Sequence, residues 1–229
     1  MKIKNPFRDL TPFEICLWSI SMAITAVSYL FSGTDGMLSM IASLIGVTAL
    51  IFVAKGYVFG QVLTVVFAVF YGIISFKFKY YGEMITYLCM TAPIAVATVI
   101  EWLRHPYKGS KEVQVSRLTR VQSAVMIVGS VLSTAVFYFI LGALGNTNLI
   151  ISTLSVTTSF AASYLTFCRS PYYALAYAAN DIVLICLWGL ASVESLRYLP
   201  MVFCFVMFFA NDIYGFYNWK RMQKRQGEM

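Results

Sequence analysis

The stretch Tyr172–Ala191, YYALAYAANDIVLICLWGLA, is long and apolar enough to cross a membrane, yet it carries an Asn-Asp pair near its centre. A second pair, Asn211-Asp212, interrupts the apolar run Leu199–Tyr217. A carboxylate at membrane depth costs roughly 2.5–3.5 kcal/mol even on the most lenient insertion scale. The two pairs therefore predict a polar site that faces protein, water or a ligand inside a bundle of membrane helices.

The composition places the whole chain in the membrane class. Of its 229 residues, 59% are hydrophobic and only 12% are charged, against about 25% charged residues in soluble domains. We expect an all-α integral membrane protein that has the lipid bilayer as its surroundings. About eight segments have the length and polarity of a transmembrane helix: Pro12–Phe31, Met37–Ala54, Val58–Phe76, Glu83–Leu103, Val121–Leu144, Leu149–Phe167, Tyr172–Ala191 and Leu199–Tyr217.

The distribution of positive charge predicts how these segments cross the membrane. With eight spans and a cytoplasmic N-terminus, every Lys and Arg except Lys77, Lys79 and Arg197 falls on the cytoplasmic side. This bias follows the positive-inside rule, so both termini are expected in the cytoplasm. It also explains the net charge of +7 without a nucleic-acid partner.

Several function classes lack their motifs in this sequence. The five cysteines have no paired spacing and lie in or beside apolar runs, which favours free thiols used as small apolar residues. His105 is the only histidine, and a metal site needs three or four ligands, so neither a metal nor another cofactor is expected. No catalytic motif is recognisable either, although two Asp residues could in principle form an intramembrane catalytic pair.

A weak internal repeat appears when the sequence is shifted by 117 residues. The shift places Tyr71-Gly72 on Trp188-Gly189, Trp102-Leu-Arg104 on Trp219-Lys-Arg221, and Thr64 on Asp181. It spans an even number of helices, so the two copies would cross the membrane in the same direction. Parallel repeats are one architecture of secondary transporters, including SWEET proteins. A chance match between apolar helices is the alternative explanation.

The repeat predicts a division of the chain into five parts. Residues 1–36 hold an additional N-terminal helix. The first three-helix bundle covers 37–103, and 104–148 contain a basic cytoplasmic loop and a linker helix. The second bundle covers 149–217 and is followed by a basic cytoplasmic tail, 218–229.

Polar and aromatic residues of both bundles are predicted to converge near the middle of the membrane. Helical spacing puts Tyr177, Asp181 and Trp188 on one face of the seventh span, while Gln61, Thr64 and Tyr71 line a face of the third. Such groups suit a small, flat solute that is cationic or forms hydrogen bonds. The candidate substrate-binding residues are Gln61, Thr64, Tyr71, Tyr177, Asn180, Asp181, Trp188, Asn211 and Asp212.

Each of these features also has a structural explanation. Asp181 and Asp212 could bond neighbouring helices and fix their packing. Trp102 and Trp219 lie where an aromatic belt would contact the membrane interface, and this is the favoured interpretation for them. A membrane scaffold or receptor that transports nothing is a further alternative. A solute-sized polar cavity between the repeats would favour a transporter, because a scaffold does not need one.

Two segments carry a family resemblance. Tyr172–Trp188, YYALAYAANDIVLICLW, and Asn211–Met222, NDIYGFYNWKRM, resemble the PnuC family of bacterial vitamin-precursor transporters. The similarity extends more loosely to Gly60-Gln61 and Tyr71-Gly72. One departure concerns the substrate helix, where some members carry a tryptophan pair followed by an asparagine. Here Trp188 stands alone and is followed by Gly189.

The resemblance implies uptake of nicotinamide riboside, a precursor of NAD, across the bacterial cytoplasmic (inner) membrane. It further implies a SWEET-like 3+1+3 fold, facilitated diffusion with alternating access, a cytoplasmic kinase that traps the riboside, and a homotrimer. Related proteins carry thiamine or other vitamins, so these substrates remain alternatives. We expect Tyr71 and Trp188 to flank the pyridinium ring and Asp181 to offset its charge or bind the ribose. Gln61 and Asn211 would then bind the carboxamide or the ribose.

Overall fold

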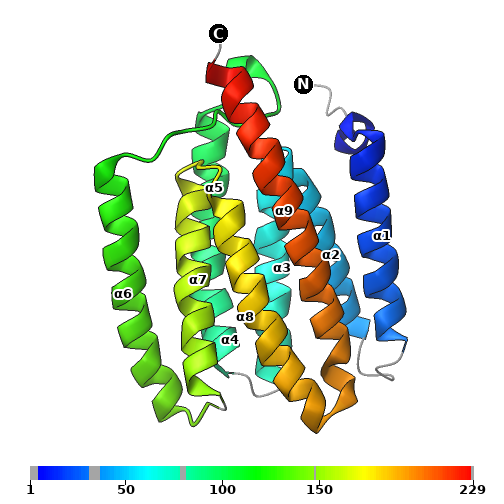
Figure 1. The fold of residues 1–229 in the computed structure, drawn as a ribbon, viewed down its shortest axis with the longest axis vertical. Helices are drawn as coiled ribbons and strands as arrows, with labels where there is room; N and C mark the ends of the chain where they lie inside the picture. The colour runs from blue at the N-terminus through cyan, green and yellow to red at the C-terminus, as the bar shows by residue number, and fades with distance from the viewer. Residues whose placement is uncertain (1–4, 31–36, 78–80, 147, 228–229) are drawn as a thin grey trace.

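The computed structural model describes residues 5–30, 37–77, 81–146 and 148–227, and helices dominate these ranges (Figure 1). Within them, eight helical segments are long and apolar enough to cross a membrane, as predicted. Phe31, the linker Ser32–Gly36 and the charged residues Lys2, Lys4 and Lys79 of the topology prediction lie outside the described residues.

The long helices begin and end within a few residues of the predicted limits, with one exception at the C-terminus. Their bounds are α1 Pro12–Tyr29, α2 Met37–Ala54, α3 Val58–Lys77, α4 Tyr81–Ile85, α5 Ala92–Arg104, α6 Arg120–Ala143, α7 Leu149–Phe167, α8 Tyr173–Glu194 and α9 Leu199–Gly227. Four short segments connect or extend them: η1 Pro6–Asp9, η3 Thr86–Thr91, η4 Tyr107–Gly109 and η5 Leu196–Tyr198.

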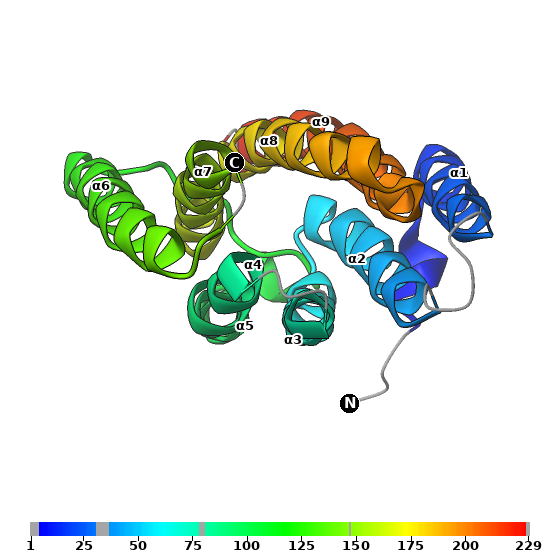
Figure 2. The same cartoon turned by 90° about the horizontal axis from the view of Figure 1, so that it is seen from below.

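The helices form two facing rows (Figure 2). One row contains α2, α3 and the continuous span α4–η3–α5, and the other contains α7, α8 and α9; α2 packs on α9 and α5 packs on α7 where the rows meet. Corresponding helices of the rows run in the same direction. Helix α6 packs on α7 at one edge, whereas α1 packs on both α2 and α9 at the other. This arrangement agrees with two parallel three-helix bundles, a linker helix and an additional N-terminal helix.

A local break in one span has a clear cause in the sequence. Pro93 has no N–H group to donate to the carbonyl of Cys89, and its ring would crowd that carbonyl in a regular α-helix. The preceding segment η3 is a π-helix, in which the Ala92 N–H reaches back to the carbonyl of Tyr87. A π-helical turn shifts the side chains of a helix relative to its axis. The π-helical turn therefore sets the directions of the Tyr87 and Thr91 side chains.

Helix α9 extends beyond the predicted end of the second bundle. It continues to Gly227, so most of the predicted tail, 218–229, is helical. The Asn218 side-chain amide donates to the Ala54 carbonyl at 2.9 Å, and the Trp219 indole N–H donates to the Val53 carbonyl at 2.9 Å. These bonds to the end of α2 hold the last part of the helix in place, so α9 extends ten residues past Tyr217, the predicted end of the span.

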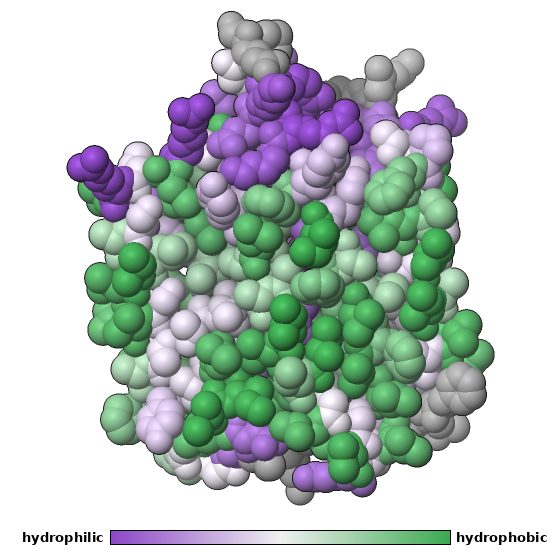
Figure 3. All heavy atoms as spheres, viewed as in Figure 1, coloured by the Kyte–Doolittle hydropathy of each residue, from purple (hydrophilic) through white to green (hydrophobic). Residues whose placement is uncertain are grey.

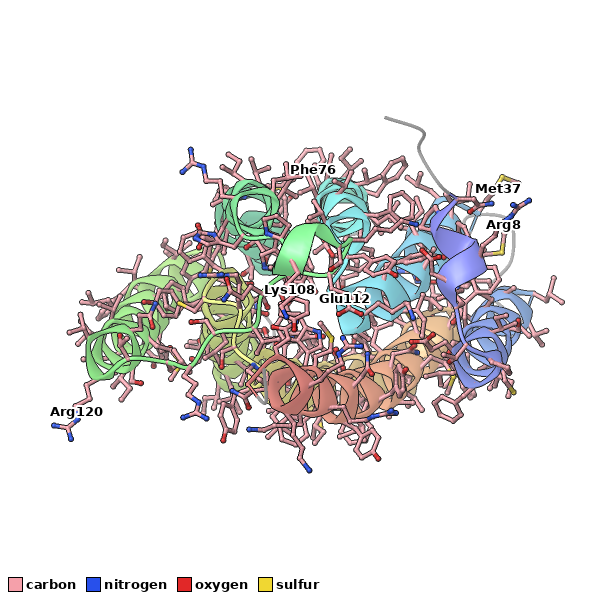
Figure 4. All side chains as sticks on the ribbon, turned by 90° about the horizontal axis from the view of Figure 1, so that it is seen from above. Arg8, Met37, Phe76, Lys108, Glu112 and Arg120 are labelled. Carbon is pink, nitrogen blue, oxygen red and sulfur yellow. The ribbon has the colours of Figure 1, made fainter. Side chains whose placement is uncertain are left out.

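Polar residues cover the end of the molecule that carries both termini, here called the terminal end (Figure 3). The loop between α5 and α6 folds over this end, and in Figure 4 Lys108 and Glu112 lie above the middle of the bundle. Val113 donates its N–H to the Gly56 carbonyl at 2.9 Å and is almost fully buried. The Gln226 side chain of α9 bonds the backbone of Val113 and Val115. The loop thus joins the two rows.

Candidate functional site

A partly enclosed cavity of about 60 Å³ lies between the two rows of helices, with a few polar side chains in a mainly apolar wall. A water molecule needs roughly 10–15 Å³ of such space, so the cavity has room for a few waters. Both rows contribute to its wall, as predicted. Its lining residues are Gly46, Ala49, Leu50, Val53, Gln61, Thr64, Phe67, Tyr87, Thr91, Ser159, Tyr177, Asn180, Asp181, Phe205, Phe208 and Asp212.

Helix α8 supplies three of the predicted site residues to this cavity. The side-chain oxygen of Asn180 accepts hydrogen bonds from Thr158 at 2.8 Å and Ser159 at 3.1 Å, both on α7. Its amide N–H groups are then left for a ligand. Tyr177 shares a hydrogen bond of 3.3 Å with Ser163. The Ser/Thr-rich face of α7 therefore orients the polar face of α8.

The two carboxyl groups of the Asn-Asp pairs meet in the cavity. Asp181 on α8 and Asp212 on α9 are both buried, and their side chains lie close enough to interact directly. Oδ2 of Asp181 is buried without a hydrogen-bond partner in the described part of the chain. A buried carboxyl oxygen that lacks a donor is destabilising, and a ligand that donates a hydrogen bond or carries positive charge would relieve this cost.

Helix α3 and the π-helical segment line the opposite wall. Gln61 is buried, and the Thr64 hydroxyl donates to the Gly60 carbonyl at 3.0 Å. Tyr87 and Thr91, which the sequence analysis did not single out, reach the cavity because of the π-helical turn. The Thr91 hydroxyl has no hydrogen-bond partner among the described residues. Pro93, six residues after Tyr87, was the only sequence signal for the positions of Tyr87 and Thr91.

Tyr71 and Trp188 lie beyond the cavity, toward the end opposite the termini, here called the far end. The Trp188 indole N–H donates to the Tyr71 hydroxyl at 3.2 Å. The Tyr71 ring packs on the cavity-lining ring of Tyr87, with 4.3 Å between centroids. Trp188 contributes to a separate pocket on its other side. The pair therefore separates the two spaces. The sequence had predicted instead that both residues line one cavity with Asp181.

A second aromatic pair closes the terminal end. The rings of Trp102 and Trp219 lie 5.4 Å apart, and both residues are buried. Trp102 donates its indole N–H to the Thr166 carbonyl of α7 at 3.1 Å, and Trp219 donates to α2 as described above. The interpretation as an interfacial aromatic belt is wrong for both residues, because each crosses to the opposite row of helices.

The 117-residue shift gains support from these contacts. Tyr71 and Trp188 are separated by that number of residues and are bonded to each other. Trp102 and Trp219 have the same separation and are in ring contact. Thr64 and Asp181 correspond likewise and line one cavity. Corresponding residues of the two bundles thus meet along one line through the molecule, as a two-fold relation between parallel repeats requires.

Asn211 lies apart from this line. Its amide nitrogen donates to the Ser21 hydroxyl of α1 at 3.0 Å and to the Met207 carbonyl at 2.7 Å. The side chain is buried against α1 and is absent from the cavity wall. The predicted contact of Asn211 with substrate is therefore not supported by this arrangement, and the residue instead attaches α9 to α1.

No group of three or more His, Cys, Asp or Glu residues that could hold a metal ion occurs among the described residues. The site thus consists of carboxyl, amide, hydroxyl and aromatic groups in a cavity between two helix bundles. Eight predicted spans, parallel repeats and such a cavity define a membrane transporter for a small polar solute.

Comparisons with known proteins give the family. The family described as nicotinamide mononucleotide transporter matches residues 36–221. A nicotinamide riboside transporter PnuC from Neisseria mucosa is 28% identical over 96% of this chain and 85% of its own length, and one from Haemophilus influenzae is 25% identical over 93% and 92%. A crystal structure of the vitamin B3 transporter PnuC has a TM-score of 0.81 and 27% identity, covering 95% of this chain and 94% of that one. The chain belongs to the nicotinamide mononucleotide transporter family, whose members are transporters and not enzymes.

Proposed function

We propose that this protein transports nicotinamide riboside across the bacterial cytoplasmic membrane. Its relatives carry that name, and the central cavity offers the matching chemistry. Asp181 and Asp212 can balance the positive charge of the pyridinium ring, while Gln61 and Asn180 can bond the carboxamide or the ribose hydroxyls. Tyr87, Phe67 and Phe208 provide ring faces for a flat cation.

The absence of positive charge from the cavity favours the riboside over its mononucleotide. No Lys or Arg is among the described residues that line the cavity. A phosphate group placed there would meet two carboxyl groups and no cation, whereas phosphate sites normally use Arg, Lys or backbone N–H groups. Thiamine is the second candidate, because its flat thiazolium ring also carries a single positive charge and it has no phosphate.

We propose alternating access about the line of paired residues as the mechanism. The Tyr71–Trp188 pair would close the far end, and the Trp102–Trp219 pair would close the terminal end. The cavity holds only a few waters, so the bundles must separate to admit a riboside. Nothing in the proposal requires an ion gradient. The transport is thus facilitated diffusion, driven by removal of the riboside through a cytoplasmic kinase.

The proposed orientation places the terminal end in the cytoplasm, following the positive-inside rule. A homotrimer completes the proposal, and α6 supports it. This helix packs on a single side, and only 6% of its membrane segment is buried within the chain. Its remaining apolar surface can contact lipid or another copy.

Calorimetry with the purified protein tests the substrate assignment. We expect binding of nicotinamide riboside, and at least tenfold weaker binding of the mononucleotide and of thiamine. Asp181→Asn should weaken riboside binding by about tenfold or more, because it removes the charge that faces the ring. Asn211→Ala is the control and should leave affinity unchanged, since that side chain contacts α1. Preferential binding of the mononucleotide would refute the proposal.

A further inference from the structure

A second polar pocket lies at the far end, on the other side of the Tyr71–Trp188 pair. It has a volume of about 50 Å³. Its wall includes Trp188 and the start of α4, the α6–α7 connection and the end of α8. Six residues give it its chemical character: Glu83, Asn146, Asn148, Ser152, Trp188 and Glu194. Two acids, two amides, a hydroxyl and an indole resemble the central cavity in kind.

Glu83 is the unusual member of this pocket. Only 6% of it is exposed, and it accepts a long hydrogen bond from the Ser155 hydroxyl at 3.3 Å. Within the described part of the chain, no Lys, Arg or His forms an ion pair with it. A buried carboxylate without a cation is costly, and acidic groups inside membrane helices usually belong to functional sites.

Glu14 shows how this chain stabilises a buried carboxylate that has a structural role. It is 1% exposed and bonds the Lys55 ammonium group at 2.8 Å. It also accepts hydrogen bonds from the Tyr214 hydroxyl at 2.8 Å and the Thr11 N–H at 2.7 Å. Glu83 has a similar burial and a single hydroxyl partner. The missing counter-charge is what a bound cation would supply.

The position of Glu83 connects it to the transport route. It lines the far-end pocket together with Trp188, whose indole is bonded to Tyr71. It also lies within electrostatic reach of Tyr71 and of Tyr87, which lines the central cavity. A solute that enters from the far end would therefore meet Glu83 before it reaches the closed aromatic pair.

We propose that the far-end pocket is a first binding site for a flat organic cation, with Glu83 as its counter-charge. The inference rests on the proposed function and adds a second site to it. The ring lies against Trp188, and the amide of Asn148 bonds its polar substituents. Glu194 is exposed at the rim and attracts cations over a longer range. A phosphorylated solute is repelled by both acids before it reaches the central cavity.

Uptake kinetics in reconstituted vesicles test the role of Glu83. Glu83→Gln keeps an oxygen that can accept the Ser155 bond but removes the charge. We expect the half-saturation constant for nicotinamide riboside to rise about tenfold, with the maximal rate within about twofold of wild type. Glu83→Asp should restore most of the affinity. Glu101→Gln makes the same change in α5, near the terminal end, and should leave the half-saturation constant unchanged.

Two results would overturn the inference: an unchanged half-saturation constant in Glu83→Gln, or equal impairment of Glu83→Gln and Glu83→Asp. If the wild-type protein fails to carry riboside at all, the proposed function itself is wrong. A competition assay on the wild type needs no variant to fold. The cation 1-methylnicotinamide should inhibit riboside uptake at concentrations at least tenfold lower than uncharged nicotinamide does, and equal inhibition by the two would also refute cation recognition.

Discussion

The hydrogen bond between Trp188 and Tyr71 allows a direct test of alternating access. Tyr71→Phe removes the acceptor at 3.2 Å and keeps the ring that packs on Tyr87. A hydrogen bond of this type contributes about 1 kcal/mol net, which corresponds to a factor of about five in an equilibrium. If the bond forms only when the far end is closed, the variant should increase the far-open population about fivefold.

Thiol labelling measures this population. Ala49 lines the central cavity and is 2% exposed, so Ala49→Cys in a background without the native cysteines reports on access to the cavity. A membrane-impermeant thiol reagent applied from the far side should react about five times faster in Tyr71→Phe. Tyr173→Phe is the matched control, because that buried tyrosine is remote from the far end and its hydroxyl forms no hydrogen bond with the described residues.

The result also distinguishes a gate from general loosening of the fold. With a gate, labelling from the terminal side slows or stays constant, because opening one end excludes opening the other. Equal acceleration from both sides would mean that Tyr71→Phe merely loosens the bundle. An unchanged labelling rate from the far side would show that the Trp188–Tyr71 bond does not hold that end closed. The proposed role of this pair in closing the far end would then be wrong.

Two further predictions concern the terminal end and α1. Trp219→Phe removes the bond to the Val53 carbonyl, so labelling from the terminal side should rise at least fivefold while far-side labelling does not; a rise on the far side would contradict the assignment of ends. Glu14→Gln leaves the nearly buried Lys55 without its partner and weakens the Tyr214 bond. We expect the free energy of unfolding to fall by about 2 kcal/mol, which lowers the apparent melting temperature by about 4–8 °C. Thermal unfolding in detergent measures this shift. A shift below about 1 °C would show that the ion pair contributes little to stability.

The sequence was sufficient to predict the spans because each is an apolar run of membrane length. It also predicted which helices form the cavity, since Asp181 and its repeat partner Thr64 share the wall. The end of α9 was missed. Its last turns are polar, and hydropathy contains no sign that Asn218 and Trp219 bond the end of α2.

The structure places some candidate residues away from the cavity where their assignment depended on the rotation of a helix about its axis. Asp212 and Asn211 are neighbours, yet one faces the cavity and the other faces α1. Helical spacing places both on broad, overlapping faces and cannot decide between them. Tyr87 was missed for the related reason that a π-helical turn changes the spacing on which such reasoning depends.

The two ends of the transport route are closed by unequal means, and this inequality bears on the direction of uptake. At the far end, corresponding residues of the repeats bond each other through one pair of side chains, Tyr71 and Trp188. At the terminal end, Trp102 and Trp219 each bond a backbone carbonyl of the opposite row, and Val113 of the covering loop packs against them. Opening the terminal end breaks these two bonds and the bond from Asn218 to the Ala54 carbonyl, whereas opening the far end breaks the Trp188–Tyr71 bond and the long Ser155–Glu83 bond of 3.3 Å. A protein with these contacts should therefore open more readily toward the far end, where the riboside arrives in the proposed orientation. It should open at the terminal end only when other interactions offset the larger cost.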